Sequence, residues 1–238
     1  MLGIVIILAV SWILLYLIEK KSILALGFLP ILKRLTQFAG GFLFTAVLCV
    51  GIQTLEILLQ SSEWHLNGGF SAYQFFDSLR WDFISVLTEE LVFRGALLVI
   101  LINRLGAGKA ILISAIAFGI YHWFSFGIFG NVVPMFFVFI GTGFMGYAWA
   151  LAFAKTNSIF IALGLHLGWN FTFNTIFSHG PLGEGLLIST GGNAISDWFS
   201  LVGLWLVPVI VFLVVKYFVP SESREIRQEK VKTTADIL

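Results

Sequence analysis

About seven apolar runs of roughly 20 residues recur along the chain, and they constrain its fold more than any other feature. A hydrophobic stretch of about 18 or more residues can cross the hydrocarbon core of a bilayer as a helix. The runs cover approximately residues 2–18, 38–59, 81–102, 110–128, 132–153, 158–177 and 198–218. They predict an all-α fold, a polytopic transmembrane bundle with about seven spanning helices.

A shorter apolar segment, residues 23–32, leaves the number of helices open. It contains Pro30, and basic residues flank it on both sides. We expect it to lie at the membrane interface or to re-enter the membrane, with half of an eighth helix as the alternative. A membrane protein is also what the composition predicts, because 58% of the residues are hydrophobic and 11% are charged, against about 25% charged in an ordinary soluble domain.

The loops predict an orientation in the membrane. Lysine and arginine gather after the first, third, fifth and seventh runs, whereas the other connections are acidic or uncharged apart from Arg80 at a helix edge. Cytoplasmic loops carry an excess of Lys and Arg, so we predict an N-terminus outside and a C-terminus in the cytoplasm. Residues 1–219 would form one membrane-embedded domain, and residues 220–238 would be a polar cytoplasmic tail.

Three charges interrupt the third apolar run near its middle: Glu89, Glu90 and Arg94. A charge at the centre of a spanning helix costs roughly 2.5–3.5 kcal/mol of insertion free energy, so such residues mark a site, a proton relay or a conduction path. Glu90 and Arg94 are four residues apart with the acid first, the favourable order for an ion pair. Glu89 projects about 100° away from Glu90, which leaves it free to act.

Two histidines lie inside apolar runs, and each belongs to a pair with helical spacing. Phe118 precedes His122 by four residues, and His166 precedes Asn170 by four. Residues four apart share a helix face, so an imidazole and a carboxamide project together from the second pair. Any one of these residues is more often a packing or helix-bridging group. Together, three helices supply Glu-Glu-x-x-x-Arg, Phe-x-x-x-His and His-x-x-x-Asn.

The remaining signals predict no second site. Residues 141–146 spell Gly-x-Gly-x-x-Gly, but they lie in a spanning run with no preceding strand, so close helix packing explains them better than dinucleotide binding. Cys49 is the single cysteine, which excludes an intrachain disulfide. The formal net charge of +1 gives no indication of nucleic-acid binding. The two long outer connections, residues 60–80 and 178–197, are expected to be solvated loops, with a lid over the membrane surface as the alternative.

The three motifs, in this order and spacing, resemble the CPBP family of intramembrane proteases. That family includes the Rce1-type CaaX prenyl endopeptidases and bacterial relatives linked to bacteriocin immunity. The resemblance covers about residues 82–173, inside a protease core of about 80–177. It implies an integral protein of a prokaryotic plasma membrane that hydrolyses peptide bonds of membrane-associated proteins or peptides. The catalytic residues that it implies are Glu89, Glu90, Arg94, His122, His166 and Asn170.

Two mechanisms fit these residues. In the first, Glu89 with His122 takes a proton from water, while Asn170 and His166 donate hydrogen bonds to the oxyanion. In the second, Glu89, His122 and His166 bind a catalytic zinc as in metalloproteases. We prefer the metal-free mechanism, because an amide is a natural oxyanion donor and a poor zinc ligand.

Two other classes of function use similar residues. A proton-coupled transporter also places Glu, Arg and His within the membrane, although no two halves of this sequence align as transporter repeats often do. A non-catalytic immunity or scaffold protein would bind a peptide without cutting it. Loss of function on mutating Glu89 would indicate the enzyme, whereas a scaffold would tolerate the change.

Overall fold

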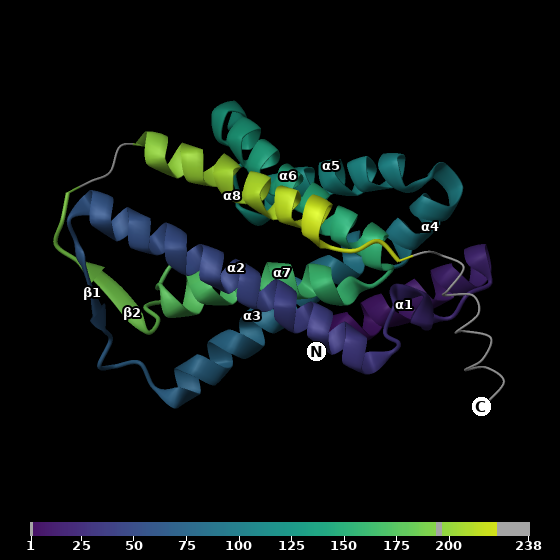
Figure 1. The fold of residues 1–238 in the computed structure, drawn as a ribbon, viewed down its shortest axis with the longest axis horizontal. Coiled ribbons are helices and arrows are strands. Elements are labelled where there is room, and N and C mark those ends of the chain that lie inside the picture. Colours follow the sequence, from purple (N-terminus) through teal and green to yellow (C-terminus); the bar gives the residue numbers. More distant parts are fainter. Residues whose placement is uncertain (1, 194–196, 223–238) are drawn as a thin grey trace.

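The computed structural model describes residues 2–193 and 197–222, and it is helical almost throughout (Figure 1). Its helices are α1 (Leu2–Glu19), α2 (Ile31–Gln60), α3 (Ala72–Phe93), α4 (Ala96–Leu105), α5 (Ala107–Ser125), α6 (Val132–Thr156), α7 (Ile159–Phe171) and α8 (Asp197–Phe218). A 3₁₀ turn, η1 (Ile23–Leu26), follows α1, and a π-helical turn, η2 (Thr172–Ile176), continues α7. The predicted all-α helix bundle is confirmed.

Among the described residues, five segments are long and apolar enough to cross a membrane, which supports an integral membrane protein. They are Leu2–Glu19, Ile23–Gln60, Ala107–Ser125, Val132–Thr156 and Ile159–Ile176. The predicted run at 198–218 corresponds to α8, of which the apolar stretch Val202–Phe218 is shorter than these spans. The orientation predicted from the loop charges stays a prediction.

The predicted single helix over residues 81–102 is wrong, because the chain breaks it in two. Helix α3 ends at Phe93 and α4 begins at Ala96. Gly95 lies between them, with φ −81° and ψ −138°, and a Cβ added there would collide with the carbonyl oxygen of Leu91. This break supplies the eighth helix. The segment at 23–32, the other candidate for an eighth helix, holds only the short turn η1 before α2 begins.

The two long connections also differ from the solvated loops that we expected. Strand β1 (Glu63–Leu66) pairs antiparallel with β2 (Leu187–Thr190), and the pair lies at the end of the molecule opposite α4 (Figure 1). The Asn67 side chain donates to the Gly185 carbonyl at 3.0 Å. Four-residue strands this far apart in sequence give no pattern of alternation long enough to predict their pairing.

Helices α3 and α7, which carry most of the predicted site residues, begin at capping serines. Ser71 and Gln74 form a reciprocal capping box at the start of α3. Ser158 accepts from the Phe160 N–H at 3.3 Å and donates to the Gly27 carbonyl at 2.7 Å. Such caps satisfy amide groups that the first helical turn leaves without partners. They therefore fix where each of these helices starts.

Small residues let the helices approach closely around α7. A Cβ at Gly164 or Gly168 would collide with the backbone of α2, so these glycines set the close contact between α2 and α7. The close packing predicted for residues 141–146 is also present. A Cβ at Gly141 would meet Leu204 of α8 at 2.5 Å, and one at Gly146 would meet Phe118 of α5 at 2.9 Å.

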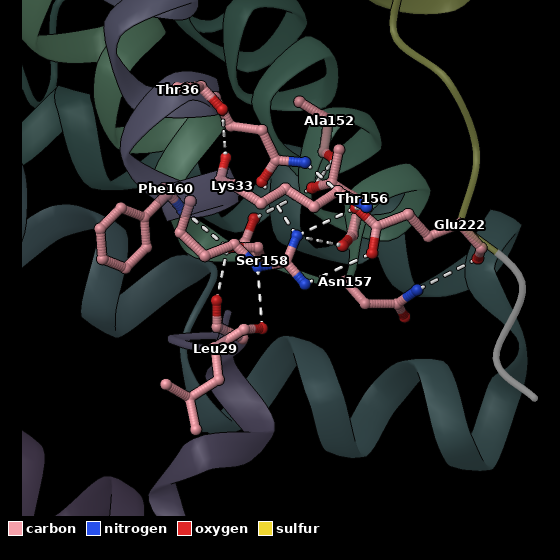
Figure 2. A network of polar contacts seen from close by, with 12 residues as sticks. Leu29, Lys33, Thr36, Ala152, Thr156, Asn157, Ser158, Phe160 and Glu222 are labelled. Atoms are coloured by element: carbon pink, nitrogen blue, oxygen red, sulfur yellow. Dashed lines mark hydrogen bonds and ion pairs between the residues drawn. The ribbon is translucent and has the colours of Figure 1, made fainter. Parts of the chain in front are cut away.

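The segment after α8 is fixed to the start of α2 by Glu222 (Figure 2). Its carboxylate accepts hydrogen bonds from Arg34 at 3.0 and 3.3 Å and from Gln37 at 3.1 Å, and the Lys33 ammonium lies 3.1 Å away. Arg34 also donates to the Thr156 carbonyl, at the end of α6. Of the tail predicted at 220–238, residues 223–238 lie outside the described residues.

We expect Glu222→Gln to lower the free energy of unfolding by about 1.5–3 kcal/mol at neutral pH, the range for hydrogen bonds to charged groups. Burial opposes ionisation of Glu222, but its bonds with Arg34 and Lys33 prevail and lower its pKa below the usual value of a glutamate. A carboxyl group whose pKa is lower in the folded than in the unfolded protein stabilises the folded state when the pH is above the unfolded-state pKa. This stabilisation is lost as the pH falls through the folded-state pKa.

The measurement is thermal unfolding in detergent of wild type and Glu222→Gln, from pH 7 down to pH 3. The difference between the two proteins should shrink on acidification. Glu184→Gln, at an exposed loop position, serves as the control and should match wild type throughout. A Glu222→Gln protein as stable as wild type at pH 7 would show that these contacts do not stabilise the fold.

Candidate active site

Glu90 and Arg94 form a fully buried ion pair where α3 gives way to α4. Arg94 Nη1 donates to Glu90 Oε1 at 3.1 Å, and neither side chain has any exposed surface. Arg94 Nη2 donates to the carbonyl oxygen of Gly146 on α6, also at 3.1 Å. The ion pair expected from the four-residue spacing is therefore present, and Arg94 ties it to a second helix.

His166 on α7 lies against both carboxylates. Its Nδ1 is 2.9 Å from Glu90 Oε1, and its Nε2 is 3.8 Å from Glu89 Oε2. Because a carboxylate only accepts hydrogen bonds, Nδ1 carries the proton in the contact with Glu90. Nε2 is then the ring nitrogen that faces Glu89.

Glu89 is the more exposed of the two carboxylates and has fewer hydrogen-bond partners. Its side chain is 16% exposed, against none for Glu90. Its Oε2 is buried and makes no hydrogen bond to any described residue. Buried polar atoms normally have a partner, so this oxygen is available to accept a hydrogen bond from a bound molecule.

His122 on α5 lies in an aromatic cage. Its Nδ1 donates to the Phe118 carbonyl at 2.8 Å, which leaves the lone pair of a neutral ring on Nε2. Ring centroids of Phe118, Tyr121 and Phe126 lie 4.5, 5.2 and 5.1 Å from its own. Phe118 also meets His166 edge-on at 6.1 Å, so one phenylalanine contacts both imidazoles.

Asn170 lies one turn after His166 on α7 and is half-buried. Its amide group makes no hydrogen bond within the described part of the chain. The structure thus joins Glu89, Glu90, Arg94 and His166 directly and connects His122 to them through Phe118. It places Asn170 beside this group only by the helical spacing.

The model of one protein family, the type II CAAX prenyl endopeptidase Rce1-like family, matches residues 71–172. This stretch runs from the capping Ser71 to the residue after α7 and contains all six predicted site residues. The match covers less than half of the chain, and this part of the chain is similar to the Rce1-like family. The match supports an intramembrane endopeptidase of the CAAX type in general. No curated protein and no solved structure matches the chain.

Two residues of the Rce1-like region that lie outside the sequence motifs, Asp82 and Trp149, also make buried contacts. The indole of Trp149 stacks on His166 with centroids 3.9 Å apart and 21° between the rings. Asp82, seven residues before Glu89 and so on the same face of α3, accepts from Asn174 at 2.7 Å and Thr175 at 3.2 Å. Both residues belong to η2, and π-helical turns of this kind are frequent at functional sites.

Sequence spacing contained part of the signal for these contacts. Trp149 follows Gly146 by three residues and so shares a helix face with it, and Gly146 ends the glycine pattern that predicted close packing. Asp82 is a third acid in an apolar run. What the sequence did not show is the partner of each residue, which lies on another helix.

The donor set considered for zinc does not converge in this structure. Among residues 2–193 and 197–222, no three His, Cys, Asp or Glu side chains are close enough together to hold a metal ion. Each imidazole turns Nδ1 toward an acceptor of the protein, Phe118 for His122 and Glu90 for His166, so Nε2 is the nitrogen of each ring that could face a ligand. Glu89, His122 and His166 therefore do not fit a three-ligand metal centre as arranged here.

Proposed function

We propose that the Rce1-like site cleaves membrane-associated peptides with a water molecule that Glu89 activates, without a metal ion. In both carboxylates Oε2 has no hydrogen bond to the described residues, and the observation that supports the choice of Glu89 is that its side chain is 16% exposed whereas that of Glu90 is fully buried. Glu90, by contrast, is occupied by Arg94 and by His166. Of the two carboxylates, Glu89 is the one that can take a proton from a bound molecule.

In this mechanism, the oxygen of water attacks the carbonyl carbon of the scissile peptide bond while its proton passes to Glu89. His122, whose Nε2 makes no hydrogen bond to any residue that the structure describes, accepts from the same water and orients it. The tetrahedral intermediate then collapses, the C–N bond breaks, and Glu89 returns the proton to the leaving amine. The products are a free carboxylate and a free amine, so no covalent enzyme intermediate is required.

The developing oxyanion needs hydrogen-bond donors. The Asn170 amide, which makes no hydrogen bond to the described residues, is our first candidate. His166 through Nε2 is the second, and it donates as the doubly protonated imidazolium, because Nδ1 already donates to Glu90. Arg94 and Glu90 have a different role: they hold His166 and the end of α3 in place. Their ion pair is fully buried, so removing either partner would leave the other charge buried and unpaired.

The cellular substrate can be sought by comparing membranes from cells that make wild-type protein with cells that make Glu89→Gln. New peptide termini that appear only with wild type identify substrates and support the proposal. A purified assay complements this search, with an internally quenched peptide ending in a farnesylated CaaX sequence as the probe. If wild type yields no new termini and leaves the probe intact, the proposed function is wrong.

Asn170→Ala is expected to lower kcat by about 10²–10³-fold, the loss typical of one oxyanion donor. The fold should persist, because the amide makes no hydrogen bond that the substitution would break. The measurement is cleavage of the farnesylated probe, with Asn131→Ala as the control. Asn131 is exposed and caps α6 without a side-chain hydrogen bond. An Asn170→Ala protein with wild-type kcat would exclude the amide as an oxyanion donor.

A further inference from the structure

Helix α6 contains none of the six motif residues, yet two of its residues contact them. The Gly146 carbonyl accepts the hydrogen bond from Arg94. One turn later, the Trp149 indole lies almost parallel to the His166 imidazole, with 3.9 Å between ring centroids. Residues three apart on a helix project to the same side, so α6 supports the site with one face.

The Trp149 ring is itself held firmly. It is 4% exposed, and Phe118 meets it nearly edge-on with centroids 5.6 Å apart and 76° between the rings. The Arg94 guanidinium carbon lies 5.3 Å from the indole and 4.2 Å from the Phe118 ring. The indole therefore cannot turn without disturbing both the arginine and the phenylalanine.

This stack determines how the His166 ring can be oriented. The Nδ1 contact with Glu90 at 2.9 Å fixes one edge of the imidazole, but a single hydrogen bond leaves the ring free to tilt. A flat indole at 3.9 Å fixes its plane as well. With both constraints, Nε2 points toward Glu89, 3.8 Å from Oε2.

The Trp149 indole N–H contributes nothing to this arrangement. It is buried and has no hydrogen-bond acceptor among the described residues. Burying a donor without a partner is unfavourable, so the value of the residue lies in its aromatic face. Phenylalanine at position 149 should therefore retain part of the function of the indole, whereas leucine, which has no ring, should not.

We propose that Trp149 is a positioning residue, which holds the His166 imidazole in the plane that directs Nδ1 to Glu90 and Nε2 to Glu89. The inference rests on the proposed function of this site, because it gives His166 and Glu89 their roles in the reaction. Trp149 itself does not contact the reacting atoms in this account. It acts through His166.

The test compares Trp149→Leu, Trp149→Phe and Trp205→Leu with wild type in detergent. Trp205 on α8 is a matched control, since its ring stacks on Phe137 at 6.0 Å and away from the site residues. One measurement is the proton NMR shift of the His166 ring in histidine-labelled protein, assigned by its loss in His166→Gln. The other is kcat and KM on the farnesylated probe, with thermal stability recorded for each variant.

We expect the His166 ring proton in wild type to be shifted upfield by the indole ring current, and Trp149→Leu to remove that shift. Trp149→Leu should lower kcat by about 10²-fold, the loss that follows a small misplacement of a catalytic group, with KM unchanged. Trp149→Phe should recover most of kcat, and Trp205→Leu should match wild type in both measurements.

The proposal is wrong if Trp149→Leu keeps the wild-type kcat, if Trp149→Phe is as impaired as Trp149→Leu, or if the loss of kcat only follows the loss of folded protein. It is also wrong if the His166 shift is the same in wild type and Trp149→Leu. Failure of the proposed function gives a different result, because wild type would then not cleave the probe while the ring-current shift would still report the stack.

Discussion

Glu89→Gln is expected to abolish cleavage by a protein that remains folded. The amide has nearly the same shape as the carboxylate but cannot accept the proton of water, and general-base catalysis contributes about 10²–10⁴-fold to a rate. Glu89 Oε2 makes no hydrogen bond to the described residues, so its replacement breaks no hydrogen bond of that oxygen and changes only its 3.8 Å contact with His166 Nε2. The measurement is kcat on the farnesylated probe, expressed per folded molecule.

Glu184→Gln is the matched control for this variant, because it makes the same chemical change at an exposed loop position. It should cleave the probe at the wild-type rate. A Glu89→Gln protein that also cleaves at that rate would rule out Glu89 as the general base. Loss of folded protein in Glu89→Gln would instead give Glu89 a structural role that the contacts do not indicate.

Breaking the Glu90–Arg94 pair should have the largest effect on stability. Glu90→Gln or Arg94→Ala leaves one buried charge without its partner, a loss of about 3–5 kcal/mol for a fully buried pair. Both side chains are entirely buried. Each side chain also makes a second hydrogen bond that the substitution would disturb: Glu90 with His166, and Arg94 with the Gly146 carbonyl. Thermal unfolding in detergent is the measurement, with activity recorded per folded molecule.

A double variant, Glu90→Leu with Arg94→Met, tests the origin of this loss. If the cost arises from an unpaired buried charge, removing both charges should destabilise the protein less than removing one. If each single variant unfolds with a free energy within about 0.5 kcal/mol of wild type, the usual range for surface substitutions, the result would contradict the buried ion pair seen in the structure. A double variant that is less stable than either single would assign the loss to packing.

The spacing of residues along the sequence predicted those features that involve side chains of a single helix. The four-residue intervals placed Glu90 beside Arg94 and His166 beside Asn170, because side-chain position along a helix follows its period. Apolar runs predicted the bundle and its long spans, because only helices of that length satisfy their backbone within a bilayer. These inferences need no knowledge of the tertiary structure.

The break between α3 and α4 could not be predicted in the same way. Residues 81–102 are apolar on both sides of Gly95, and a lone glycine is tolerated inside a membrane helix. The reason for the break is tertiary: Arg94 has left the helical conformation, with φ −121° and ψ 7°, and reaches the Gly146 carbonyl on α6. This donor and acceptor are 52 residues apart in the sequence, so the pattern of apolar residues within one segment cannot predict their hydrogen bond.

The supporting residues of the site were missed for a related reason. Trp149 in an apolar helix has the pattern of an ordinary core residue, and its importance lies in the ring that it contacts on α7. Asp82 was visible as a charge, but its partners on η2 follow it by more than 90 residues. Contacts of this kind are set by how the helices pack.

The most direct test of the central claim compares the two neighbouring carboxylates in one assay. Wild type, Glu89→Gln and Glu90→Gln are purified, the folded fraction of each is measured, and cleavage of the farnesylated probe is followed per folded molecule. Our account predicts that Glu89→Gln is stable and inactive, whereas Glu90→Gln is less stable because Arg94 loses its partner. Full activity in Glu89→Gln, together with a stable and inactive Glu90→Gln, would contradict it.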